Sequence, residues 1–332
     1  MKKVYTIAAL AVLSLLTSCK KAMNSQEIYD KTASGVVLIM NYFYYSLTMP
    51  DGTEIYFTGV DNNGELEGLT FDKDEAWENC SGCTGTGFFI SDDGLIMTNR
   101  HVATPEIDEK SIKAFLKGYK KMLKNIYQEK RNKLATMYYS YEGNGAAQNE
   151  LAQQYQKMGA ILEQIDDMDM NEAEFNTHGK VSIAYNDTHV VKFEDLKPCT
   201  VIAVSDDEAV DLAIIQLDDC ETPEGRYIFK LRDNDEQLTL DQKLYMIGFN
   251  RGFSIAQTAQ GIRSQCYSGN VTQKDDGEKI LYSIPSQSGS SGSPVIDEYG
   301  NLVAVNFAGY TGTQGFNYGI PSKRIRQFML DN

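Results

Sequence analysis

Three short segments of this 332-residue chain contain the residue types that nucleophilic catalysis by serine requires. Ser291 lies in GSSGSP, His101 lies in TNRHV, and Asp211 opens the apolar run DLAII. A serine hydroxyl needs a base to take its proton, and a carboxylate orients that base and stabilises the cation that it becomes. We therefore expect Ser291 to be the nucleophile, His101 the base and Asp211 the orienting carboxylate.

The stretch of serines and glycines around Ser291 allows two interpretations. Its composition suits a flexible linker, but the apolar pair directly after Pro294 indicates a strand that begins at a tight turn. Glycine two residues before the serine can adopt a conformation that residues with a β-carbon resist, so that backbone N–H groups converge. We expect the N–H groups of Gly289 and Ser291 to form an oxyanion hole.

The order His, Asp, Ser along the chain is that of the chymotrypsin-like proteases. More closely, the motifs TGTGF, TNRHV, DLA and GSSGSP resemble those of the HtrA/DegP-type envelope serine proteases. The tail NLVAVNFAGYTGTQGFNYGIPSKRI is similar to the last strands of that family. The resemblance covers most of residues 28–332 outside a helical insertion, and the family's catalytic residues fall on His101, Asp211 and Ser291.

This resemblance implies a chymotrypsin-like double β-barrel that hydrolyses proteins or peptides through an acyl-enzyme. It implies no metal and no cofactor, and it allows a homotrimer. We expect no PDZ domain after the protease, which would be a departure from the family. GSSGSP is closer to the bacterial glutamyl endopeptidases, in which a histidine binds the substrate glutamate. That position is Asn306 here, so we do not expect glutamate specificity.

Substrate is expected to add a strand to the edge formed by residues 306–308, with side-chain pockets selecting the sequence. The pocket and edge residues carry no charge, which favours small or medium uncharged side chains over Lys or Arg. The predicted substrate-binding residues are Pro285, Ser286, Ser288, Asn306, Phe307, Ala308 and Asn317.

Short β-branched or aromatic runs alternate with turn residues from Val36 onward, which predicts an all-β barrel fold. The dipeptide Asp93-Gly94 predicts a hairpin. Between Glu106 and Phe175 the apolar residues instead recur at the helical period in two series, separated by the turn GNG at 143–145. We expect an antiparallel helical hairpin inserted over 105–177 of one protease domain, 28–332, which ends in a short helix at 323–332.

The N-terminus has a basic start and a short apolar run, as in an export signal. Its end, LTSC, resembles the bacterial lipobox, although an ordinary signal with a chance cysteine would look similar. We expect a signal peptide over 1–18, lipidation of Cys19 and a linker over 19–27. The protein would then be anchored to the bacterial cell envelope, in the outer membrane rather than the inner one.

Net charge and cysteines give the remaining expectations. The charge of −15 and the absence of an evident basic stripe exclude nucleic acid and anionic lipid as partners. Cys199 and Cys220 flank two apolar runs that would form a hairpin, so we predict a disulfide between them. Cys80 and Cys83 have redox or zinc spacing without a second such pair, and either a local disulfide or two thiols would fit.

Two other functions stay open on the sequence alone. A catalytically silent lipoprotein could use the barrel as a peptide-binding or chaperone-like module. A redox protein could use Cys80 and Cys83, provided that the two thiols cycle.

Overall fold

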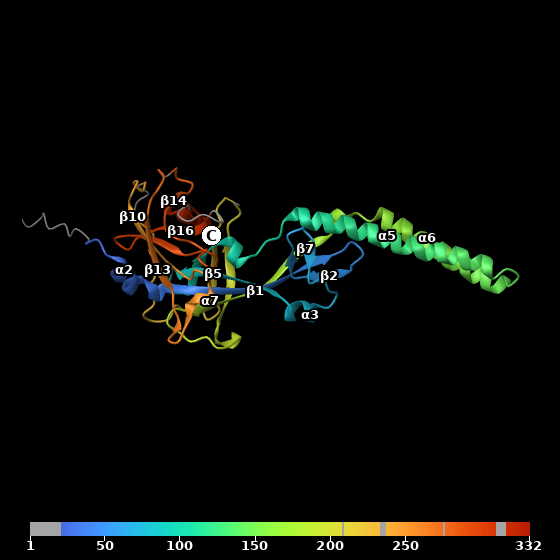
Figure 1. The fold of residues 1–332 in the computed structure, drawn as a ribbon, viewed down its shortest axis with the longest axis horizontal. Helices are drawn as coiled ribbons and strands as arrows, with labels where there is room; N and C mark the ends of the chain where they lie inside the picture. Colours follow the sequence, from blue (N-terminus) through green and yellow to red (C-terminus); the bar gives the residue numbers. More distant parts are fainter. Residues whose placement is uncertain (1–20, 208, 233–236, 275, 310–316) are drawn as a thin grey trace, which may run out of the picture. The chain divides into compact units, whose positions relative to one another are not determined.

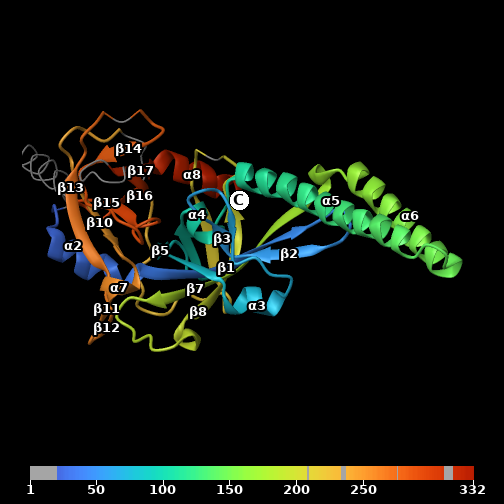
Figure 2. The same ribbon diagram turned by 45° about the vertical axis from the view of Figure 1, so that its right-hand side comes forward.

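The computed structural model describes residues 21–332 except 208, 233–236, 275 and 310–316. The predicted signal peptide and Cys19 lie outside the described residues. Among the helices of the described part, none is long and apolar enough to cross a membrane. The polypeptide path is shown in Figures 1 and 2.

The first sheet contains seven strands in the order β2-β1-β5-β6-β9-β8-β7, and β7 also pairs with β1. This extra pairing closes six of the strands into a barrel, to which β2 is attached. Closure leaves those six strands without an open edge. The strands are β1 (Val36–Thr48), β2 (Glu54–Phe57), β5 (Ser81–Phe89), β6 (Leu95–Thr98), β7 (Glu174–Tyr185), β8 (Lys197–Val204) and β9 (Ala213–Leu217).

The second sheet has six strands in the order β13-β10-β15-β16-β17-β14. A bridge between Val271 and Tyr282 connects the two ends of this order, so the sheet is curled. The terminal helix α8 (Ser322–Asp331) buries Ile325 and Phe328. The strands are β10 (Lys243–Gly248), β13 (Gln265–Asn270), β14 (Ile280–Tyr282), β15 (Pro294–Asp297), β16 (Leu302–Gly309) and β17 (Asn317–Pro321).

The remaining elements are short, apart from two long helices. They are α2 (Ser25–Thr32), β3 (Gly59–Val60), β4 (Leu66–Glu67), α3 (Lys73–Glu78), α4 (Arg100–Ala103), α5 (Glu109–Ser140), α6 (Gly145–Asp167), α7 (Phe253–Ala256), β11 (Gln257–Thr258) and β12 (Gly261–Ile262), with 3₁₀ turns at Ala33–Gly35, Met170–Glu172 and Phe193–Asp195.

The chain divides into two compact units. Unit 1 comprises the described part of residues 1–40 together with Thr84–Ala103 and Val181–Asn332. It contains all three candidate catalytic motifs and the curled sheet. Unit 2 comprises Asn41–Cys83 and Thr104–Lys180. The sequence predicted only an insertion at 105–177, because the pairing of Asn41–Cys83 with that segment involves residues far apart in the chain.

Unit 2 contains the long helices α5 and α6, which lie side by side (Figures 1 and 2). The turn at residues 141–144 joins them, as the sequence predicted. Helix α6 buries Leu151, Leu162 and Ile165 at the helical period, and α5 buries Ile112 and Leu116, which pack with apolar residues of β1 and β2. The prediction of an all-β fold is therefore wrong for the chain as a whole. The chain combines the two large β-sheets with two helices of 32 and 23 residues.

A histidine in unit 2 makes the stability of that unit depend on pH. The His178 ring stacks on Tyr44 with centroids 4.8 Å apart, and its Nε2 lies 2.8 Å from the Ser46 hydroxyl. Burial, with a further contribution from Lys73, lowers the pKa of His178, and Glu54 opposes the shift weakly. Folding therefore favours the neutral ring, while the unfolded chain takes up a proton at the ordinary pKa of about 6.5.

We expect unit 2 to be fully stabilised by this neutral ring above about pH 6.5 and to lose that stabilisation as the pH falls towards the lower folded-state pKa. The single tryptophan, Trp77, lies 5.9 Å from the Tyr44 ring, so its fluorescence reports unfolding of this unit. Urea midpoints measured between pH 7.5 and 5 should fall less steeply in His178→Gln than in the wild type. Identical slopes would contradict the prediction.

Candidate active site

His101 and Asp211 meet at two points. The backbone N–H of His101 donates to Asp211 Oδ1 over 3.0 Å, and its ring Nδ1 lies 2.6 Å from Asp211 Oδ2. The imidazole is 50% exposed while the carboxylate is only 18% exposed. A carboxylate on Nδ1 leaves Nε2 as the ring atom that can accept a proton from a nucleophile. This arrangement suits a general base.

The pairing of β6 with β9 explains why these two residues meet. The strands are antiparallel, and Thr98 at the end of β6 is opposite Ala213 at the start of β9. His101 lies three residues beyond one end and Asp211 two residues before the other. Asn99, which follows β6, holds the segment before β9 in place, because its Nδ2 donates to the Asp211 carbonyl over 2.7 Å. Two local motifs are therefore brought together by one strand pair.

Ser291 lies in the turn that precedes β15. Gly289 has φ +92° and Gly292 has φ +84°, which is the left-handed region that residues with a β-carbon rarely adopt. A β-carbon on Gly292 would lie 2.1 Å from the Thr86 carbonyl oxygen and 3.2 Å from the Asn99 backbone nitrogen. The linker interpretation is therefore wrong, since both glycines are required by the geometry of a packed turn.

This turn lies against the strand pair that leads to His101. The N–H of Thr86 on β5 donates to the Ser291 carbonyl over 2.8 Å. Within the described residues, no hydrogen bond of the Ser291 hydroxyl is recorded, and the side chain is partly exposed. Hydrogen bonds between a nucleophile and its base are often long in free enzymes and tighten with substrate.

The neighbouring N–H groups of the turn divide into two sets. Those of Ser290, Gly292 and Ser293 donate to the carbonyl oxygens of Gln287, Asn306 and Ser290 over 3.0, 2.8 and 3.0 Å. The N–H groups of Gly289 and Ser291 have no acceptor among the residues that the structure describes. These are the two N–H groups that the sequence predicted for the oxyanion hole.

The amides predicted to line the substrate pocket are engaged inside the protein. Asn306 is 1% exposed, and its Oδ1 accepts a hydrogen bond from the Tyr282 hydroxyl over 2.8 Å. Its Nδ2 donates to the Ser290 carbonyl over 3.0 Å and to Ser286 Oγ over 3.1 Å. Asn317 is 3% exposed, and its Nδ2 donates to Ile284 O over 2.6 Å. The structure thus gives Asn306 and Asn317 an internal role in holding the turn.

The other predicted substrate residues lie at the surface near the turn. Pro285 and Ser288 are exposed and Phe307 is partly exposed. Pairing between β15 and β16 ends at Val305, although the Asn306 backbone still bonds to Ser293 and Gly292. Ala308 on β16 pairs with Tyr318 on β17. The side of β16 that faces away from β17 is therefore unpaired at residues 307–308 in the described part, as strand addition requires.

The predicted disulfide between Cys199 and Cys220 is absent, since all five cysteines of the described part are free thiols. The hairpin of β8 and β9 does form, but its register places Cys199 opposite Leu217, and Cys220 follows in a turn at φ +54°. Burial raises the pKa of Cys83 to about 11 and also raises that of Cys80. Raised pKa values disfavour the thiolate that redox chemistry needs.

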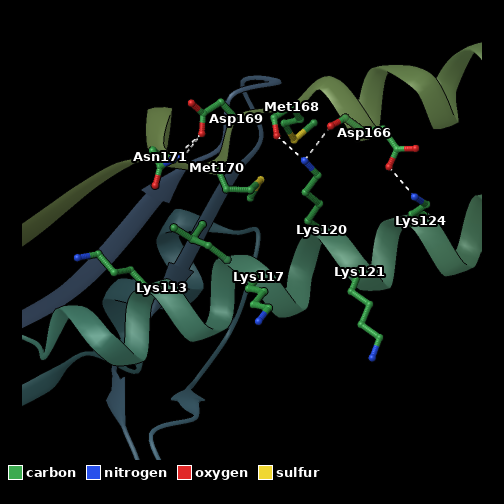
Figure 3. Close-up of a pocket in the computed structure, with 11 residues that line it drawn as sticks. Lys113, Lys117, Lys120, Lys121, Lys124, Asp166, Met168, Asp169, Met170 and Asn171 are labelled. Atoms are coloured by element: carbon green, nitrogen blue, oxygen red, sulfur yellow. Dashed lines mark hydrogen bonds and ion pairs between the residues drawn. The ribbon is translucent and has the colours of Figure 1, made fainter.

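Unit 2 contains a separate cavity of about 540 Å³ along α5 (Figure 3). Lys120 reaches across it to the Met168 carbonyl over 2.7 Å, and Lys124 pairs with Asp166 over 2.6 Å. Both lysines neutralise the negative end of α6. Helix α5 contains nine Lys or Arg and two Glu, so it is a basic segment in an acidic chain. No group of acidic, His or Cys residues suited to a metal occurs in the described part.

Comparison with known proteins shows a family similarity for part of the chain. Residues 173–305 match the family described as trypsin-like peptidase domain. The matched stretch includes Asp211 and Ser291, while His101 precedes it on the other side of the helical hairpin. This part of the chain is therefore similar to trypsin-like peptidase domains.

Among solved structures, the chain is similar to the serine endoprotease from Yersinia pestis, at 12% sequence identity and a TM-score of 0.46. The alignment covers 94% of this chain and 67% of that chain. No curated protein matches the sequence significantly.

Proposed function

We propose that this protein is a serine endopeptidase that cleaves proteins or peptides through an acyl-enzyme. Ser291 attacks the scissile carbonyl carbon while its proton passes to His101, and the C–N bond then breaks as His101 returns that proton to the leaving amine. A water molecule, deprotonated by His101, hydrolyses the acyl-enzyme and restores the Ser291 hydroxyl. Asp211 keeps the imidazole oriented and stabilises its cationic form.

The contact between Asp211 and His101 is the observation that carries the proposal. One carboxylate accepts from both the backbone and the ring of the same histidine, while the far side of that ring remains open. A carboxylate with no role beyond its position near the start of a strand would not need to contact both the backbone N–H and the ring of one histidine. The N–H groups of Gly289 and Ser291, which have no acceptor among the described residues, add a site for the negative charge of the tetrahedral intermediate.

Specificity for small or medium uncharged side chains and addition of a substrate strand along residues 306–308 are part of the proposal. So is attachment to the cell envelope through lipid on Cys19, which is supported by the N-terminal sequence alone. The amides of Asn306 and Asn317 are occupied internally, so selection would depend on the shape of the pocket and on backbone contacts.

A fluorophosphonate probe tests the proposal directly, because it reacts with an activated serine. The wild type should be labelled at Ser291, as located by peptide mass spectrometry, and Ser291→Ala should not be labelled. Ser25→Ala, which removes an exposed hydroxyl on α2, should be labelled like the wild type. A folded wild type that resists the probe and leaves a peptide library uncleaved would instead favour a silent peptide-binding module.

A further inference from the structure

The buried residue Thr86 on β5 contacts the nucleophile turn through both its backbone and its side chain. Its N–H donates to the Ser291 carbonyl and its hydroxyl donates to the Gly289 carbonyl, each over 2.8 Å. The same hydroxyl accepts from the Phe249 N–H over 3.0 Å, and the Thr86 carbonyl accepts from the Thr98 hydroxyl over 2.8 Å. Thr86 is fully buried, so water does not replace any of these contacts.

The two carbonyls that Thr86 holds belong to Gly289 and Ser291, whose N–H groups have no acceptor in the part of the chain that the structure describes. A peptide group is planar, so a fixed carbonyl fixes the whole plane that joins it to the next residue. The plane between Gly289 and Ser290 is held at its carbonyl end by the Thr86 hydroxyl and at its N–H end by Gln287 O. Because Gly289 has no β-carbon to restrict rotation, this plane depends on such contacts.

Other groups hold the peptide planes on either side. The Ser288 carbonyl accepts from the Arg251 N–H over 2.6 Å, which orients the plane that ends in the Gly289 N–H. The Ser290 carbonyl accepts from Asn306 Nδ2 over 3.0 Å, which orients the plane that ends in the Ser291 N–H. Both neighbouring planes are connected through the central one, so a rotation of the central plane would displace both donors.

We propose that Thr86 is a positioning residue that holds the oxyanion hole in its productive geometry. The inference rests on the proposed function, because it assigns a role relative to the tetrahedral intermediate at Ser291. Thr86 does not touch substrate and takes no proton. Its hydroxyl keeps Gly289 in place, and its N–H keeps the carbonyl of the nucleophile in place.

The test compares Thr86→Val, which removes the hydroxyl and keeps the shape, with Thr86→Ser, which keeps the hydroxyl. Thr86→Val should lower kcat about ten- to a hundredfold on a peptide substrate with KM within about twofold, since a displaced oxyanion donor acts in the transition state. Affinity for a peptide aldehyde, which forms a tetrahedral adduct with serine, should fall by a similar factor. Thr86→Ser should restore most of both.

Thr98→Val is the matched control, because it removes a hydrogen bond of the same length from an equally buried threonine. Both valine variants should lower the thermal midpoint, but Thr98→Val should retain kcat within about threefold. Equal losses of kcat in the two variants, or an unchanged kcat in Thr86→Val, would overturn the inference. Should Thr86→Val not fold, Thr86→Cys, with its weak donor, should give an intermediate kcat and aldehyde affinity.

Probe labelling of the wild type separates this inference from the proposed function. If Ser291 is labelled and Thr86→Val is as active as the wild type, only the positioning role is wrong. If the folded wild type is not labelled, the proposed function fails and the role of Thr86 fails with it.

Discussion

Asp211→Asn is expected to lower kcat about 10⁴-fold with little change in KM. The backbone N–H of His101 donates to one carboxylate oxygen, so the amide oxygen of the new side chain must take that place. The amide NH₂ then faces Nδ1 of the ring, where Asp211 Oδ2 lies in the wild type. A donor in that position favours the tautomer with its proton on Nε2, which cannot accept a proton from Ser291. The negative charge that stabilises the imidazolium is lost as well.

Steady-state kinetics on a cleavable peptide measures this effect, with Asp206→Asn as the control. Asp206 is exposed on the adjacent turn, so its substitution makes the same change in charge without touching the histidine. We expect Asp206→Asn to have nearly wild-type kcat. If Asp211→Asn retained more than a tenth of the wild-type kcat while folded, Asp211 would not be the orienting carboxylate.

Gly292→Ala is expected to lower kcat about a hundredfold and to destabilise unit 1 by about 2–5 kcal/mol, from left-handed strain together with overpacking. The new methyl group would lie 2.1 Å from the Thr86 carbonyl oxygen and 2.4 Å from the Thr98 hydroxyl. Neither atom can retreat easily, because both belong to the barrel strands that pack on the turn. The turn must move instead, and a displacement of about 1 Å at the nucleophile costs about a hundredfold in rate.

Gly225→Ala separates the two causes of this loss. Gly225 has φ +81°, close to that of Gly292, but a β-carbon there would meet no atom within 4 Å. It should therefore show only the cost of left-handed backbone, about 1–2 kcal/mol, with unchanged kcat. Denaturation midpoints and kcat, measured for both variants, separate backbone strain from overpacking. A Gly292→Ala enzyme as stable and as active as Gly225→Ala would contradict the close packing of the turn.

The elements that the sequence predicted well are those whose signals are local. The hairpin predicted at Asp93-Gly94 forms between β5 and β6, and Gly94 takes φ +81° there. The two long helices follow the apolar period of 3.6 residues, and the terminal helix begins one residue before its predicted start. Each of these features needs only a few neighbouring residues to specify it.

The features that the sequence missed depend on contacts between distant residues. The sequence predicts Asn306 in a substrate pocket because of its place in a motif. In the structure its amide is hydrogen-bonded to Tyr282, Ser286 and Ser290. The disulfide at Cys199 required an opposite cysteine, and the register of β8 with β9 supplies Leu217 instead. Composition and spacing do not specify register or the partner of a buried amide.

The sequence by itself determined which residues are candidates for catalysis, because His101, Asp211 and Ser291 each lie in a short motif that local sequence specifies. Only the tertiary structure decided that β6 and β9 bring the histidine to the aspartate, and that Thr86 reaches both carbonyls of the turn. It also decided that Asn41–Cys83 joins the helical hairpin in a second unit. The physical reason is that chain-distant hydrogen bonds and burial depend on how strands pair, which no local pattern of side chains specifies.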